Sequence, residues 1–411
     1  MSDDHQFLAD VDTWIRDALS AGELGFGELV KMLPGVDPAL VASQLRKSPA
    51  LDTKVHWPEV AHSDQQESDL PVPHPLDFDW RFTPPTIAAL TSELVGRTAV
   101  TLVGTPSLWI SLKGRLPSSR LHLLDANPLL VRPPRSGVSK SQVRIVDVLT
   151  DPIPRIAPAE VVVVDPPWYP EVIEGFLWVA ASLAIEGGEV WLSVPAPGTR
   201  PGVLMEREKL LEQAASYGLK LRSLREGALR YACPPFERAT LRASGMLRFV
   251  PADWRKGDLF IFERIGSIVG DRPLAHQQRW TECSLEGVRI RVDTTSPARG
   301  ENPQLISLLE GDVISSVSRR DPLRSVVRVW TSGNRVFGCE APHRFLKIVE
   351  ALHRKRTIPS SFSEVAARLL VLVDLERREY ICSDDSRIVV PSSSGRGRTR
   401  TGSVANRRKQ A

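Results

Sequence analysis

The chain has 411 residues, which is long for one globular domain and predicts two or three. Apolar residues make up 42% and charged residues 25%, as in soluble globular proteins, which excludes a wholly disordered or collagen-like chain. No apolar run approaches the roughly 18 residues that cross a bilayer, and the acidic N-terminus MSDDHQ is unlike a secretory signal. We therefore expect a cytoplasmic protein without a membrane span.

The net charge of +4 is distributed unevenly along the chain. Residues 1–79 hold 15 acidic and 5 basic side chains, whereas residues 395–411 hold six basic and no acidic ones. An acidic beginning and a basic end predict partners of opposite charge. The cysteines form no CxxC pair, so neither a metal site nor a disulfide framework is expected; they are Cys233, Cys283, Cys339 and Cys382.

Residues 1–60 are typical of a winged-helix or helix-turn-helix unit. Apolar residues recur at helical spacing over 8–19, and two shorter helical patterns cover 26–33 and 39–46, the last opened by Asp37-Pro38. A DNA-reading unit needs Lys and Arg to neutralise phosphates, and the acidic charge of this region opposes that. We favour contact with protein or with the next domain, and DNA reading is the alternative.

A polar, then proline-rich stretch, residues 61–79, predicts a linker. Over residues 80–268, apolar runs of strand length alternate with helical patterns, which predicts an α/β domain with a Rossmann-like, doubly wound sheet. The predicted strands cover 99–103, 120–124, 143–146, 161–164 and 189–194, the helices 171–183 and 205–217, and an antiparallel pair 247–250 with 259–264.

Residues 269–390 have a different rhythm and predict a small α+β domain. A hairpin is expected around Ser332-Gly333-Asn334, followed by helical sequence over 342–373 that breaks at Ile358-Pro359. Residues 391–411 are rich in Ser, Gly and Arg and predict a disordered basic tail. The tail either attracts nucleic acid or an acidic partner electrostatically, or only increases solubility.

The most specific motif is VVVVDPPWYP, residues 161–170. An apolar strand ends at Asp165, on the sheet edge where parallel α/β domains bind ligands. Pro166 and Pro167 supply carbonyl oxygens but no amide donors, so the Asp carboxylate and a proline carbonyl can accept two hydrogen bonds from one amino group. Trp168 and Tyr169 can stack on a flat or cationic substrate. The motif predicts a site where an amine nitrogen acts as nucleophile.

This D-P-P-aromatic element resembles motif IV of the S-adenosylmethionine-dependent methyltransferases that modify amino groups. The resemblance implies a class I methyltransferase fold with S-adenosyl-L-methionine as the donor. Gly104 ends the first strand, and Asp125 and Asp147 follow the second and third. With Thr105 they are the expected donor-binding residues. The loop after the first strand, TLVGTPSLWIS, has one glycine where the family has several.

Residues 5–265 as a whole resemble the branched-chain polyamine synthases, which share this fold and transfer an aminopropyl group from decarboxylated S-adenosylmethionine. The shared order is a winged helix, a linker ending in R-F-T-P-P-T at 81–86, a strand with V-G, and D-P-P. That family has aspartates directly after the first-strand glycine, whereas this chain has Thr105, Pro106 and Ser107. Since a polycation needs carboxylates, the difference favours methyl transfer.

Three functions stay open: methyl transfer to a small amine, a nucleobase or a protein amine; aminopropyl transfer; and a non-catalytic adaptor, which the glycine-poor loop motivates. A base in duplex DNA would have to be flipped out. Loops 195–202 and 230–238 are predicted lids, and Cys233 is expected to be an ordinary thiol because no histidine accompanies it. A homodimer is left open.

Overall fold

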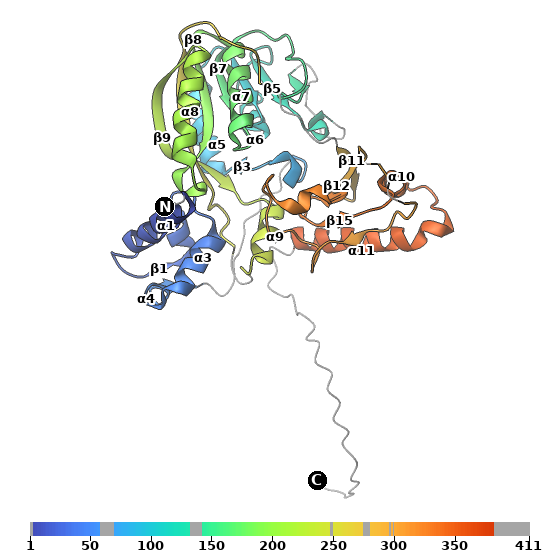
Figure 1. The fold of residues 1–411 in the computed structure, drawn as a ribbon. Coiled ribbons are helices and arrows are strands. Elements are labelled where there is room, and N and C mark those ends of the chain that lie inside the picture. Colours follow the sequence, from blue (N-terminus) through green and yellow to red (C-terminus); the bar gives the residue numbers. More distant parts are fainter. Residues whose placement is uncertain are drawn as a thin grey trace, which may run out of the picture.

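The computed structural model describes residues 3–57, 70–131, 142–246, 250–273, 280–295, 297–298 and 300–381 (Figure 1). The chain forms an N-terminal helical unit, a central α/β domain and a C-terminal unit built on an antiparallel sheet, with separate buried cores. The basic tail, Cys382 and residues 61–69 of the predicted linker lie outside the described residues, and the domain boundaries stay a prediction.

The central domain is built on an eight-stranded sheet with the order β3-β9-β10-β8-β7-β4-β5-β6. Five neighbouring strands run parallel, and the chain reverses its direction across the sheet between β6 and β7. β10 runs antiparallel to both β8 and β9. The strands are β3 (Arg81–Phe82), β4 (Val100–Val103), β5 (Leu121–Asp125), β6 (Val143–Ile145), β7 (Ala159–Val164), β8 (Ala184–Pro195), β9 (Leu219–Ala232) and β10 (Lys256–Arg264).

A parallel sheet with one antiparallel strand inserted between two parallel ones, here β10, is the arrangement of class I methyltransferases, so the predicted Rossmann-like fold is confirmed. The short edge strand β3 is an addition that pairs antiparallel with β9. The predicted pairing of 247–250 with 259–264 is wrong for the second run, which lies in β10 and has β8 and β9 on its two sides. Residues 247–249 of the first run lie outside the described residues. β9 was missed because its solvent-facing positions are charged, and its long antiparallel partner, not an apolar run, keeps it in the sheet.

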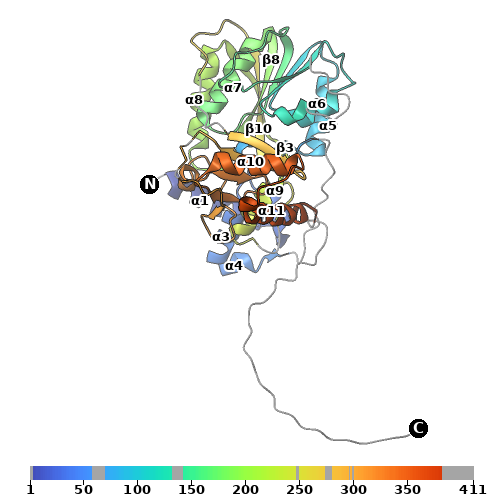
Figure 2. The same ribbon diagram turned by 90° about the vertical axis from the view of Figure 1, so that its right-hand side faces the viewer.

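Helices cover both faces of this sheet (Figure 2). α7 (Pro170–Leu183) and α8 (Val203–Ser216) pack on one face, and α5 (Pro84–Leu94) and α6 (Pro106–Leu112) pack on the other. α5, α6 and α7 each begin with proline, whose missing N–H has no partner to lose in the first turn of a helix. The sheet therefore has a buried core on each side, and its carboxyl edge is left for a ligand.

The N-terminal unit contains α1 (Asp3–Ala18), α2 (Phe26–Met32), α3 (Pro38–Lys47), α4 (Pro49–Asp52) and a parallel pair of short strands, β1 (Leu24–Gly25) and β2 (Val55–His56). The predicted start of α3 is confirmed, because Asp37 Oδ1 accepts a hydrogen bond from the Ala39 amide at 2.7 Å. The core of the unit also includes Leu241 and Trp254, so it packs against α9 (Pro235–Ala243). Its winged-helix identity stays a prediction.

The C-terminal unit has a five-stranded sheet of order β11-β12-β14-β15-β13, with α10 (Pro342–His353) and α11 (Ser363–Ile381) packed against it. The predicted hairpin is confirmed, because β14 and β15 pair around a turn in which Asn334 has φ +66°. The strands are β11 (Trp280–Leu285), β12 (Val288–Asp293), β13 (Ile306–Ser307), β14 (Val329–Thr331) and β15 (Val336–Gly338). Short 3-10 turns cover Pro75–Asp77, Pro128–Val131, Pro197–Thr199, Pro322–Ser325 and Ser360–Phe362.

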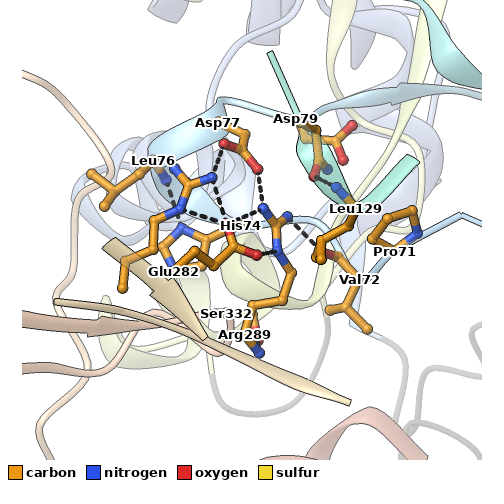
Figure 3. A network of polar contacts seen from close by, with 12 residues as sticks. Pro71, Val72, His74, Leu76, Asp77, Asp79, Leu129, Glu282, Arg289 and Ser332 are labelled. Atoms are coloured by element: carbon orange, nitrogen blue, oxygen red, sulfur yellow. Dashed lines mark hydrogen bonds and ion pairs between the residues drawn. The ribbon is translucent and has the colours of Figure 1, made fainter. Parts of the chain in front are cut away.

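Residues 70–79, the second half of the predicted linker, are packed between the central and C-terminal units. Asp77 accepts a hydrogen bond from Arg289 Nη2 at 2.6 Å and pairs with Arg291 as well. Figure 3 shows Asp77 and Glu282 pointing toward the guanidinium of Arg289. His74 is fully buried, and its Nε2 lies 3.2 Å from the Trp330 carbonyl oxygen. This segment therefore joins the two units through a buried polar network.

Within the described residues, each helix is either too short or too polar to pass through a bilayer.

Candidate active site

A cavity of about 1160 Å³ lies at the carboxyl ends of the parallel strands. The residues that follow four neighbouring strands all line it: Gly104 after β4, Asp125 at the end of β5, Asp147 after β6 and Asp165 after β7. Because parallel strands end at the same edge, side chains far apart in sequence meet there. The structure thus brings three of the four predicted donor residues, Gly104, Asp125 and Asp147, into one cavity with Asp165 of the predicted amine site.

Asp165 is held by a compact polar network. Its Oδ1 accepts hydrogen bonds from Ser193 Oγ at 2.5 Å and from Tyr231 OH at 2.8 Å. Trp168 Nε1 donates to Ser193 Oγ at 3.0 Å, which fixes the serine in turn. Both contacts use Oδ1, and no described residue donates to Oδ2 of this half-buried carboxylate. Oδ2 is therefore free to accept a hydrogen bond from a ligand in the cavity.

The environment of Asp165 tunes its protonation. Burial raises the pKa of Asp165 to about 7, and the hydrogen bonds from Ser193 and Tyr231 oppose that rise. Near neutral pH the carboxyl therefore exists in both forms and can take up a proton. A perturbed carboxyl in a cleft is a common property of catalytic sites.

The two prolines line the cavity beside Asp165. The Pro167 carbonyl accepts a hydrogen bond from the Tyr169 amide at 2.7 Å, which closes a tight turn. No described residue donates to the carbonyl of Pro166. The Pro166 oxygen therefore stays the candidate for the second acceptor that the motif predicts.

The two aromatic residues of the motif have different surroundings. Trp168 is only 8% exposed and packs edge-on against Tyr231, with ring centroids 5.4 Å apart. The Tyr169 ring lies at the other side of the motif, and its hydroxyl accepts a hydrogen bond from the Arg319 amide at 3.0 Å. Both rings line the cavity, but most of the Trp168 side chain is buried in the adjoining hydrophobic core.

Gly104, Asp125 and apolar side chains form the part of the cavity where the sequence predicts the donor. Gly104 has φ +70°, and a Cβ there would lie 3.0 Å from the Asp165 carbonyl oxygen, so only glycine leaves this space open. Asp125 Oδ1 accepts a hydrogen bond from the Asn127 amide at 2.8 Å, while no described residue donates to Oδ2. Burial raises the pKa of Asp125 to about 7. Apolar side chains, including Phe176, complete the wall.

Asp147 and Thr105 differ in their access to the cavity. Asp147 lines it and accepts a hydrogen bond from the Leu149 amide at 2.9 Å, which turns the chain after β6. Thr105 is 2% exposed and is not among the described residues that line the cavity. Four of the five predicted donor and amine positions at strand ends therefore share the cavity, and Thr105 lies behind it.

Several residues of the site had no signal in the sequence pattern. Ser193 lies within β8, and Arg255 lies over the rings of Trp80 and Trp168, 4.1 and 4.6 Å from their centroids. Residues 315–320, 324 and 325 of the C-terminal unit also line the cavity. The residues 230–238, predicted as a lid loop, are instead the end of β9 and the start of α9, because Arg230 and Tyr231 pair with β10 and β3.

Other chemistry is less well supported. Cys233 is buried, and burial raises the pKa of its thiol far above the usual range, so it stays protonated. Among the described residues, no group of three or more His, Cys, Asp or Glu side chains is arranged to hold a metal ion. The loop 195–202 contributes Thr199 and Arg200 to the cavity, and its role as a lid stays a prediction.

No protein-family model and no curated protein matches the sequence. Among solved structures, the chain is similar to the branched-chain polyamine synthase from Thermus thermophilus, in complex with N4-aminopropylspermidine and 5'-methylthioadenosine: 15% identity over 66% of this chain and 96% of that chain, with a TM-score of 0.47. A mutein of that synthase is 16% identical over 65% of this chain and 90% of that chain, with a TM-score of 0.48. A T. thermophilus 16S rRNA N2 methyltransferase, in complex with AdoMet and guanosine, is 15% identical over 52% of this chain and 47% of that chain, with a TM-score of 0.28.

Proposed function

We propose that this protein transfers a methyl group from S-adenosylmethionine to an amine nitrogen. The observation that carries the proposal is the shared cavity: Asp165, whose Oδ2 accepts no hydrogen bond from a described residue, lines it together with Gly104 and Asp125. The Asp165 carboxylate suits an amine, and Gly104 and Asp125 suit an adenosyl donor. Asp125 would hold the ribose hydroxyls, and Asp147 would lie near the adenine.

The protein's own groups orient the nucleophile. Asp165 Oδ2 and the Pro166 carbonyl accept two N–H bonds from the amine and hold its lone pair toward the donor side. As the new N–C bond forms, the nitrogen becomes positive, and the adjacent carboxylate stabilises that charge. Because the pKa of Asp165 is raised to about 7 by burial, its carboxylate then takes up the proton that the nitrogen releases.

S-adenosylmethionine, when bound, supplies the methyl carbon, and the electron pair of the broken C–S bond stays on sulfur as a thioether. Ser193 and Tyr231 do not touch the reacting atoms in this scheme. They fix Oδ1, so that the other oxygen of Asp165 keeps its direction. Removing either hydroxyl would loosen the carboxylate and raise its pKa.

Two alternatives use the same cavity. Aminopropyl transfer would differ only in which carbon of the sulfonium faces the amine. A non-catalytic adaptor would bind no donor. Calorimetry with S-adenosylmethionine, its decarboxylated form and the demethylated product separates the three: a preference for the decarboxylated form favours aminopropyl transfer, and no binding at millimolar concentration favours the adaptor.

The test of the proposed roles uses Asp165→Asn, with Asp125→Asn as its counterpart and Glu208→Gln as an exposed control on α8. Asp165→Asn should lower transfer of a labelled methyl group by about 10² to 10⁴, with donor affinity changed by no more than a few-fold. Asp125→Asn should weaken donor binding. If Asp165→Asn abolishes donor binding instead, the assignment of the acceptor side is wrong.

A further inference from the structure

Residues 315–325 of the C-terminal unit form part of the cavity wall. This segment follows β13 and precedes β14, and its residues Ser315 to Arg320, Arg324 and Ser325 line the cavity. The hydrogen bond from the Arg319 amide to Tyr169 OH, 3.0 Å long, attaches the segment directly to the motif that begins at Asp165. The wall opposite the sheet edge is therefore contributed by a different unit.

The arginines of this segment are fixed by aromatic rings. The Arg319 guanidinium lies 4.9 Å from the ring centroid of Phe78 and 5.0 Å from that of Tyr169. Arg324 lies 4.7 Å from the centroid of Trp330 and 5.5 Å from that of Phe78. Rings that hold the face of a guanidinium leave its in-plane N–H groups free to donate. Both charges are thus held in place before a ligand arrives, which lowers the entropy cost of binding.

These arginines lack the carboxylates that their neighbours have. Arg289 and Arg291 are paired with Asp77 and Glu282. By contrast, the structure records no ion pair to a described residue for Arg319, Arg320 or Arg324. Arg324 Nε is buried without an acceptor, and the nearest acceptor for its Nη2 is the Val317 carbonyl at 3.4 Å. Arg289 and Arg291 therefore have a structural role, whereas Arg319, Arg320 and Arg324 have donors to spare.

The two buried arginines of this wall are held at a cost in free energy. Burial, together with the nearby Arg319, lowers the pKa of Arg324 to about 10, although Tyr169 and Asp321 oppose this. Burial also lowers the pKa of Arg319, and Tyr169, Glu171 and Asp147 oppose it. Two like charges in a partly desolvated wall cost free energy that a bound anion would offset.

We propose that Arg319, Arg320 and Arg324 bind a phosphate group of the acceptor, so that the substrate carries an amine and a phosphate in one molecule. That the bound molecule is the acceptor of the transfer rests on the proposed function, whereas phosphate binding by these arginines does not. Three arginines that form no ion pair with a described residue match a dianionic phosphate better than a single carboxylate, and guanidinium N–H groups match phosphate oxygens in geometry. A polyamine, which carries only positive charge, is repelled by the same wall. The class that fits is a nucleotide, either free or within a nucleic acid strand.

The test compares cytidine 5′-monophosphate with cytidine by calorimetry, on the full chain, with and without saturating S-adenosylhomocysteine. We expect the monophosphate to bind at least about tenfold tighter than the nucleoside, because hydrogen bonds to a charged group contribute about 1.5 to 3 kcal/mol. Arg324→Met and Arg320→Glu should each remove about tenfold of that preference. Arg320 is exposed, so its variant keeps the test valid if Arg324→Met fails to fold. Arg356→Glu, an exposed site on the same unit outside the cavity, is the matched control.

Equal binding of both probes, tighter binding of spermidine, or variants that behave like Arg356→Glu would overturn the proposal. A single-stranded RNA oligonucleotide identifies the source of the phosphate: a strand substrate binds more tightly than the monophosphate and loses affinity steeply with salt, and a free nucleotide does not. If no sulfonium donor binds but the arginine-dependent phosphate preference persists, the proposed function fails and the phosphate site stands.

Discussion

The contact that joins the central and C-terminal units provides a direct test of the structure. Asp77 accepts charge-assisted hydrogen bonds from Arg289 and Arg291, and the side chain of Arg289 is 1% exposed. Burial by itself would raise the pKa of Asp77, but the two guanidinium groups outweigh it and hold the pKa well below the usual range. Replacing Asp77 with Asn removes the charge and leaves two buried cations to share Glu282.

Breaking a buried ion pair by removing one partner costs about 3 to 5 kcal/mol. Asn keeps one carbonyl acceptor, so we expect Asp77→Asn to cost about 3 kcal/mol, or roughly 6 to 12 °C in melting temperature. Since the folded pKa is depressed, the stabilisation is complete above the unfolded value and is lost as the pH falls through the folded value. The difference in melting temperature between wild type and variant should be largest at pH 7 and should become smaller below about pH 4.

Thermal unfolding followed by tryptophan fluorescence measures this difference, because Trp330 lies beside the network. Glu301→Gln is the matched control: its ion pair with Arg344 lies on the surface of the same unit and should matter little. A melting temperature for Asp77→Asn within 2 °C of the wild type at pH 7, by roughly the sensitivity above, would refute the assigned role.

Three further predictions concern the cavity. Gly104→Ala should destabilise the protein by about 1 to 2 kcal/mol and weaken donor binding, because φ is +70° and the added Cβ meets the Asp165 carbonyl; melting curves and calorimetry measure both. Tyr231→Phe removes a hydrogen bond that lowers the pKa of Asp165, so the midpoint of its titration, followed by NMR of labelled aspartate, should rise from about 7; an unchanged midpoint would contradict this. Burial raises the pKa of Glu237 to about 8, so between about pH 4 and 8 the folded chain holds a proton that the unfolded chain has released. As the pH rises over that range, the melting temperature of the wild type should therefore fall relative to that of Glu237→Gln. A constant difference between the two melting temperatures would contradict this.

The sequence predicted the fold well because its strongest signals are local. The strand that ends at Asp165 is a continuous apolar run, and the start of α3 carries its own cap at Asp37. Each of these depends on neighbours in the chain, so a pattern within about ten residues identifies it. The long strand β9 escaped because alternating charges hide a strand whose pairing partner lies more than twenty residues later.

The predicted site covered one side of the cavity only. Asp125, Asp147 and Asp165 were found because each follows a strand, and parallel strands end at one edge. Ser193 had no such mark, since it is a small polar residue inside an apolar strand. Arg319 lies 150 residues beyond Tyr169, and no periodicity relates the two. Contacts between separately folded units depend on how the units dock, which a local pattern does not contain.

The packing of residues 70–79 couples ligand binding to the association of two parts of the chain. Phe78, next to Asp77, contacts both Tyr169 and Arg319. The same short segment therefore contacts β12, the motif at 161–170 and the cavity segment 315–325. A ligand that touches both units must hold them together, and by thermodynamic reciprocity tighter association must favour that ligand equally. A substitution in β12 should therefore change ligand affinity as well as the melting temperature.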